Sequence, residues 1–294
     1  NSAYGSTEYD PEVSAAVELV RGEWRPDLVL IAGDMIAGQR PALTDANVRA
    51  MWAAFDTVVA APLRRAGIPF AFTLGNHDAS GHPAHARDRR LAREYWRDAA
   101  QAPRYALADS ANFPFSYAFA LRDVFVLVLN ASTGNVADDS AQLAWVRRVL
   151  SSEPARRAHV RIALGHVPLY AVAEGRNRVG EVQAEPDSLR RILERGDVAM
   201  YVAGHHHAYY PGHRGALLLL SAGALGQGPR PLIGSDAAPY KAITVLEVHD
   251  NGVITDRTFR IDARALRPID LRTLPARIEG VNGFIVRRDV DDAG

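Results

Sequence analysis

Four short stretches of the sequence combine side chains that bind metal ions: Gly33-Asp34, Gly75-Asn76-His77-Asp78, Gly165-His166 and Gly204-His205-His206-His207. Without His77 and Asp78, they supply one carboxylate, one amide and three histidines of ligand type. Imidazole nitrogen and side-chain oxygen together suit borderline and harder divalent cations, and one carboxylate can bridge two ions about 3.5 to 4 Å apart. These residues predict a metal centre with a mixed nitrogen and oxygen ligand set.

Each of the four stretches follows an apolar run that predicts a short buried strand, at residues 27–32, 69–74, 160–164 and 198–203. In open α/β sheets, ligands bind beyond the carboxyl ends of the strands. The four polar stretches can therefore converge although they lie far apart in the sequence.

The remaining pattern predicts helices between the strands and a β-rich final third. Apolar residues recur at helical spacing from residue 11 to 20 and from 48 to 59, and further helices are expected at 142–150 and 187–194. A hairpin is predicted at 116–130, and strands without intervening helices at 217–221, 242–248 and 253–261. A single α/β domain with two sheets is the economical interpretation.

Composition excludes several classes of site and partner. The chain of 294 residues has no cysteine and a formal net charge of zero, and Lys241 is its only lysine. Disulfides, thiolate metal sites and a cysteine nucleophile are thereby excluded, and no global charge favours nucleic acid. We find no apolar run of about 20 residues that could span a bilayer and no signal pattern at the start. Whether the protein is cytoplasmic or exported stays open, as does its oligomeric state.

Each stretch alone also has an ordinary structural explanation. A glycine followed by Asp34 after a strand is usually a turn, and Gly75-Asn76-His77-Asp78 can be a capped helix start. The run from His205 to His207 can be a solvated surface segment. Four such stretches in succession, each at the end of a predicted strand, favour the metal centre.

In their order, the four stretches resemble the motifs of the calcineurin-like metallophosphoesterases, whose pattern runs D-x-H, G-D, G-N-H-[DE], G-H and G-H-x-H. The resemblance covers about residues 1–262 and leaves 263–294 as a C-terminal extension that packs on the domain or on a neighbour. It implies an α/β fold of the two-sheet αββα sandwich type with two divalent metal ions. The implied ligands are Asp34, which bridges the ions, His207 on the first ion, and Asn76, His166 and His205 on the second.

The resemblance also implies roles for the two residues that are not ligands. His77 would protonate the leaving oxygen, and Asp78 would fix the orientation of the His77 ring. A carboxylate beside an imidazole favours the protonated ring, which is what a general acid near neutral pH requires.

One family motif is absent, because no Asp-x-His precedes Asp34. We expect the first strand and its aspartate to lie just upstream of residue 1, so that Asn1 stands where the motif has histidine. A neutral oxygen in place of imidazole nitrogen favours a harder ion. Manganese is the preferred candidate, with iron, zinc, magnesium and nickel as alternatives.

The substrate is less constrained by the sequence. His85 and Arg87 lie just beyond the Gly75–Asp78 stretch and could clamp a substrate anion, or belong to the solvated face of a helix that continues to Trp96. Tyr209 could stack on a base or an aryl group, or belong to the core. The expected function is hydrolysis of a small phosphomonoester or phosphodiester by a metal-activated hydroxide. The alternative is a non-catalytic metal-binding scaffold of the same fold, which has no need of a general acid such as His77.

Overall fold

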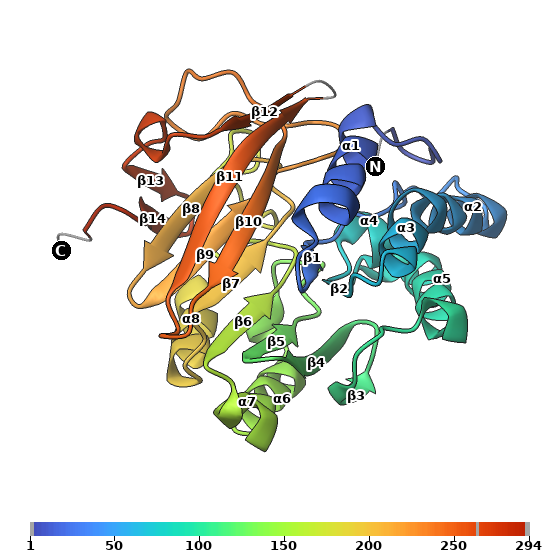
Figure 1. Cartoon of the computed structure of the whole chain (residues 1–294), viewed down its shortest axis with the longest axis horizontal. Helices are drawn as coiled ribbons and strands as arrows, with labels where there is room; N and C mark the ends of the chain where they lie inside the picture. The colour runs from blue at the N-terminus through green and yellow to red at the C-terminus, as the bar shows by residue number, and fades with distance from the viewer. Residues whose placement is uncertain (1–2, 263–264, 292–294) are drawn as a thin grey trace.

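The computed structural model describes residues 3–262 and 265–291 and shows a mixed α/β fold (Figure 1). Its largest sheet has nine strands in the order β13-β14-β8-β9-β7-β6-β5-β4-β3. A parallel pair, β1-β2, and a three-stranded antiparallel sheet, β10-β11-β12, complete the described strands. The α/β fold expected from the sequence is confirmed.

The strands and helices have the following bounds. The strands are β1 (Val29–Ile31), β2 (Phe70–Phe72), β3 (Leu107–Asn112), β4 (Ser116–Leu121), β5 (Val124–Val128), β6 (Val160–Leu164), β7 (Met200–Ala203), β8 (Tyr209–Arg214), β9 (Leu217–Ala222), β10 (Ala242–Val248), β11 (Ile254–Asp262), β12 (Ala265–Pro268), β13 (Arg277–Gly280) and β14 (Gly283–Arg287). The α-helices are α1 (Pro11–Leu19), α2 (Asp45–Phe55), α3 (Ala61–Arg65), α4 (Asn76–Ala79), α5 (Ala86–Arg97), α6 (Ser140–Leu150), α7 (Glu153–Arg157) and α8 (Pro186–Arg195).

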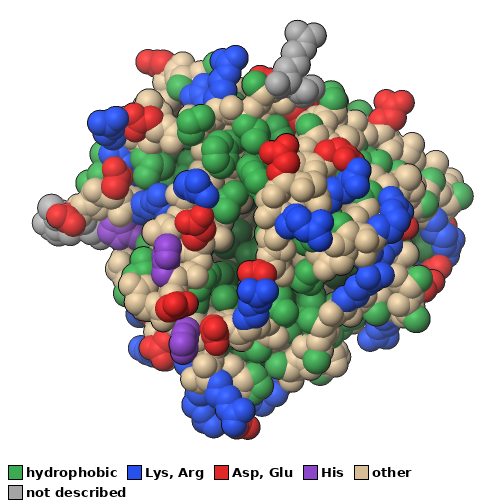
Figure 2. All heavy atoms as spheres, in the orientation of Figure 1, with side chains coloured by type: hydrophobic (Ala, Val, Ile, Leu, Met, Phe, Trp, Pro, Cys, Tyr) green, Lys and Arg blue, Asp and Glu red, His purple; other side chains and the backbone are tan. Residues whose placement is uncertain are grey.

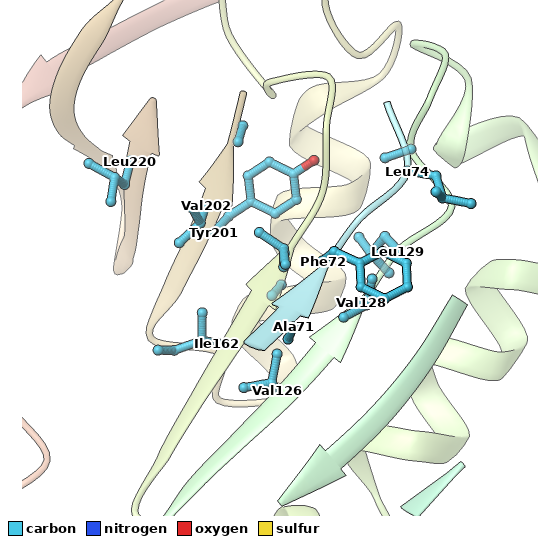
Figure 3. Packing of buried hydrophobic residues seen from close by; sticks show 14 of the residues in the cluster. Ala71, Phe72, Leu74, Val126, Val128, Leu129, Ile162, Tyr201, Val202 and Leu220 are labelled. Carbon is cyan, nitrogen blue, oxygen red and sulfur yellow. The ribbon is translucent and has the colours of Figure 1, made fainter. Parts of the chain in front are cut away.

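The core joins the β1-β2 pair to the large sheet. Figure 3 shows Ala71 and Phe72 of β2 close to the apolar side chains of β5, among them Val126 and Val128. The buried Tyr117 hydroxyl donates to the carbonyl oxygen of Phe72 at 2.7 Å and accepts from its N–H at 3.0 Å. The apolar faces and this double hydrogen bond fix β2 against the large sheet.

Parallel strand order brings the polar stretches together. β5, β6, β7 and β9 run parallel in the large sheet, and β1 runs parallel to β2. His166 follows β6, His205 follows β7, Asp34 follows β1 and Asn76 follows β2. The carboxyl ends of both sets of strands therefore meet at one edge of the molecule.

The predicted strand at residues 27–32 is shorter and less buried than expected. β1 has three residues, all of intermediate exposure, and within the described residues it pairs only with β2. Its second edge has no strand partner there, and its residues are only half-buried, whereas the apolar sequence predicts a strand buried on both faces.

The chain after residue 262 contributes to both larger sheets. β12 pairs with β11, and β14 pairs with β8 and β13. These short strands, like β3 and β8, were not expected from the sequence. None of the described helices is both long enough and apolar enough to cross a membrane.

Candidate metal centre

The structure brings four of the expected ligands together. One ligand atom each from Asp34, His166 and His205 lies within 4.8 Å of the other two. The Asn76 Oδ1 atom lies 3.0 Å from His166 Nε2 and 3.0 Å from His205 Nδ1, and Asp34 Oδ2 lies 3.3 Å from His166 Nε2. All four side chains are wholly or largely buried.

Hydrogen bonds on the far side of each histidine fix which ring nitrogen faces the cluster. His166 Nδ1 lies 2.7 Å from the carbonyl oxygen of Ala32, which can only accept a hydrogen bond. His205 Nε2 lies 2.7 Å from Glu181 Oε2. With the N–H groups donated outward, His166 Nε2 and His205 Nδ1 point lone pairs inward.

The amide of Asn76 is oriented in the same way. Its Nδ2 group donates to Gln39 Oε1 at 2.6 Å, so Oδ1 is the atom that faces the histidines. With both rings in these neutral tautomers, two imidazole lone pairs, one amide oxygen and the Asp34 carboxylate converge. Such an arrangement is repulsive unless a cation occupies its centre, and these residues therefore fit a divalent metal ion.

Glycine is required before two of the ligands because the backbone approaches the cluster closely. A Cβ atom at Gly75 would lie 2.1 Å from Asp34 Oδ1, and one at Gly33 would lie 2.5 Å from His166 Nδ1. Gly33 has a φ of 89°, and the residue after it, Asp34, has a φ of 56°. A left-handed backbone at a non-glycine residue is uncommon and often marks a functional site.

His207 follows His205 by two residues, and the charge of Asp34 acts on its ring. Its Nδ1 atom lies 2.9 Å from the carbonyl oxygen of Gly228, which leaves Nε2 as the free ring nitrogen. Burial lowers the pKa of His207 to about 4, so the ring is neutral near pH 7 and can act as a ligand. Asn1, the other ligand expected for the first ion, lies outside the described residues.

His77 lies over the carboxylate of Asp34. Its backbone N–H donates to Asp34 Oδ1 at 2.9 Å, and its Nε2 atom lies 4.0 Å from Asp34 Oδ2. The Tyr4 ring packs against the imidazole with a centroid distance of 4.9 Å. The His77 ring therefore reaches the edge of the proposed metal site.

The carboxylate of Asp78 has different partners from those expected. It accepts the N–H groups of Ile36 at 2.9 Å and Gly75 at 2.8 Å, whereas His77 Nδ1 is buried without a hydrogen-bond partner among the described residues. Burial, with the charge of Asp34 adding to it, raises the pKa of Asp78 to about 7. In the structure Asp78 thus ties together the two loops that carry Asp34 and His77, rather than contacting the His77 ring.

The three expected substrate residues have structural contacts instead. Arg87 donates to Asp88 Oδ1 at 3.1 Å and to backbone carbonyl groups of the loop before α2. His85 Nδ1 lies 3.8 Å from Asp88 Oδ2. Tyr209 is buried, and its hydroxyl donates to Asp256 Oδ2 at 3.0 Å. These contacts favour the alternative in which Tyr209 belongs to the core, whereas Arg87 holds a neighbouring loop, a role that neither expectation included.

Two residues that orient the expected ligands were missed by sequence reasoning. Glu181 lies in the long connection between β6 and α8, and Gln39 lies in the loop after β1. Neither belongs to a recognisable motif, and their partners are distant in sequence. The outer partners of metal ligands become visible only once the fold is known.

Comparisons with known proteins agree with this geometry. The family model described as calcineurin-like phosphoesterase matches residues 8–209, which is more than half of the chain. Purple acid phosphatase PPD1 from yellow lupin (Lupinus luteus) seeds has a similar structure, with a TM-score of 0.63 and 12% identity over 90% of this chain. This chain spans only 49% of the lupin protein. GAP50, "the anchor in the inner membrane complex of Plasmodium", is similar with a TM-score of 0.55 and 13% identity, over 93% of this chain and 89% of GAP50.

A search of curated proteins gives no match. The two structural similarities, at low identity, concern the fold alone, whereas the family model matches the sequence itself. The matched region contains every residue of the cluster around Asp34 and also His77. The chain therefore belongs to the calcineurin-like phosphoesterase family.

Proposed function

We propose that this protein hydrolyses a small phosphomonoester or phosphodiester at a centre of two divalent metal ions. The observation that carries the proposal is the convergence of ligand atoms from Asp34, Asn76, His166 and His205, with His77 at their edge. The family is named for phosphoester hydrolysis, and these residues provide the chemistry that such a reaction needs.

In this proposal each side chain has a defined task. Divalent cations supply Lewis acidity, which neutralises charge on phosphoryl oxygens and makes water a better nucleophile. Asp34 would hold both ions, while Asn76 and the neutral histidines would leave the site cationic. His77 donates a proton to the leaving oxygen through a ring nitrogen. Tyr4 limits the rotation of that ring.

The second half of the proposed centre needs a ligand in addition to His207 and Asp34. Asn1, the ligand expected there, lies outside the described residues. Figure 2 shows hydrophobic side chains around a hollow near the middle of the face that it draws. We propose that the ion held by Asn76, His166 and His205 binds more tightly than the ion at His207, which metal analysis of residues 1–294 would decide.

Manganese is the proposed ion, with iron, zinc, magnesium and nickel as alternatives. The described ligand set contains no thiolate and mixes imidazole nitrogen with amide and carboxylate oxygen. Such a set accepts several divalent ions, so geometry and availability decide among them.

A non-catalytic scaffold is the second candidate, because GAP50 shares the fold and is described as an anchor. The position of His77 distinguishes the two. A scaffold does not require an imidazole 4.0 Å from the carboxylate of Asp34, whereas a hydrolase requires a proton donor there.

The test compares wild type with His77→Ala after treatment with chelator and reloading with manganese. Hydrolysis of an aryl phosphate monoester and of a diester is measured for both. Loss of a positioned acid should lower the rate by roughly 10² to 10⁴ while metal content stays the same. A reloaded wild type that is inert on both substrates, with metal bound, would favour the scaffold.

A further inference from the structure

Two loops run side by side next to His207. The Ile233 N–H donates to the carbonyl oxygen of Val172 at 3.0 Å, the Glu174 N–H donates to that of Pro231 at 3.0 Å, and an antiparallel bridge joins residues 173 and 232. These contacts tie the loop at 172–178 to the loop at 228–233. The first loop carries Arg176 and the second carries Arg230.

The second loop is also tied to the proposed metal site. The Arg230 N–H donates to the carbonyl oxygen of His207 at 3.0 Å, and the carbonyl oxygen of Gly228 lies 2.9 Å from His207 Nδ1. Arg230 Nη1 lies 3.2 Å from the position of a Cβ atom on Gly175. The guanidinium of Arg230 therefore lies against the backbone beside Arg176, close to His207.

Positive charge is in excess at this place. Glu181 is the carboxylate that pairs with Arg176 and Arg178, and it also accepts from His205. No carboxylate of the described residues lies within 4.0 Å of Arg230. Two guanidinium groups thus share the Glu181 carboxylate, and the third, that of Arg230, makes no ion pair with the described residues, beside a site that binds a cation in our proposal.

Two buried donors at this place also lack acceptors. The Nε atoms of Arg176 and Arg230 make no hydrogen bond with the described residues. Buried donors without acceptors and uncompensated cations are both costly, and a bound anion removes both costs.

We propose that Arg176 and Arg230 form an anion site that recognises a second negatively charged group of the substrate, beyond the phosphoryl group that reacts. Guanidinium forks match phosphate and carboxylate oxygens well. The substrate class is then a phosphoester with a further phosphate or carboxylate. This inference rests on the proposed function, because it places that group beside His207 of the same site.

The test measures binding of pyrophosphate to chelator-treated protein by isothermal titration calorimetry, which needs no catalysis. Arg230→Gln should weaken binding about tenfold or more, since it removes a charged donor to the anion. Arg230→Lys, which keeps the charge but loses the fork, should give an intermediate affinity. Arg195→Gln, at an exposed position at the end of α8, is the control and should bind like wild type.

Two results would overturn the inference: wild type that does not bind pyrophosphate, or Arg230→Gln that binds it as tightly as wild type while remaining folded by circular dichroism.

A second experiment compares kcat/KM of the manganese-loaded enzymes for a bis-anionic phosphoester and for an aryl monophosphate. Arg230→Gln should lower the first more than the second. A wild type that hydrolyses neither substrate contradicts the proposed function, whereas the calorimetry still decides the anion site.

Discussion

The hydrogen bond from His205 to Glu181 should control the affinity of the metal centre. The two side chains are 6% and 15% exposed, and His205 Nε2 lies 2.7 Å from Glu181 Oε2. The carboxylate fixes the ring and makes its Nδ1 atom more basic. We predict that Glu181→Gln weakens divalent metal binding, because an amide keeps the hydrogen-bond acceptor and loses the negative charge.

The size of the effect follows from the geometry. A metal–nitrogen bond of about 2.1 Å, the width of the ring and the hydrogen bond together place the Glu181 charge roughly 7 Å from the ion. Coulomb's law at an effective dielectric constant of about 20 then gives roughly 2 kcal/mol per unit charge on the ion, before screening by solvent. Changes at such partners typically cost about 10- to 100-fold in affinity, or roughly 1.4 to 2.7 kcal/mol.

The assay is a titration of chelator-treated protein with manganese, monitored by isothermal titration calorimetry. Glu194→Gln is a matched control, because the Glu194 side chain is 20% exposed and pairs with Arg190 at 2.7 Å on α8, in contact with neither Asp34 nor His205. The control should bind metal like wild type. If Glu181→Gln also binds within twofold of wild type, the role assigned to Glu181 is refuted.

Two further predictions concern stability. Lys241→Met should lower the free energy of unfolding in urea by about 1 to 3 kcal/mol, because Lys241 joins the carboxylates of Asp10 and Glu12 and the substitution removes the cation between them. Burial lowers the pKa of Lys241, but the two carboxylates raise it more. The contribution of this ion pair to the free energy of unfolding is therefore complete below pH 10.5 and is lost as the pH rises further. Equal effects of the substitution on that free energy at about pH 8 and about pH 11 would contradict this. Tyr117→Phe should cost about 1 to 2 kcal/mol in the same assay, because both polar backbone groups of Phe72 lose their partner; an unchanged midpoint would show that they find another.

The sequence predicts the strands that end at the proposed metal centre, because short apolar runs followed by Gly and polar residues are a strong local signal. It does not predict β8, because Pro211 and Gly212 normally interrupt strands. In the antiparallel pairing of β8 with β9, only every second residue donates its N–H to a given neighbouring strand. Such a strand therefore tolerates the missing N–H of a proline.

The residues around the ligands depend on tertiary contacts that no local pattern encodes. Glu181 and Arg230 lie in loops without periodicity, and their positions follow from the pairing of those loops with each other and with the His205–His207 turn. Arg87 is the opposite case. It lies close to the Gly75–Asp78 stretch in sequence, but its guanidinium donates to the backbone of a neighbouring loop. Proximity in sequence to Asn76 did not determine contact with the site.

The central claim, that Asp34, Asn76, His166 and His205 hold a divalent cation, is tested most directly by metal titration of chelator-treated wild type and His166→Ala. His166 supplies a ring nitrogen 3.0 Å from Asn76 Oδ1 and 3.3 Å from Asp34 Oδ2. We predict that wild type binds manganese and that His166→Ala, which loses a ligand outright, binds it at least about 100-fold more weakly. Wild type that binds no divalent ion, or a folded His166→Ala that binds as wild type does, would contradict the account.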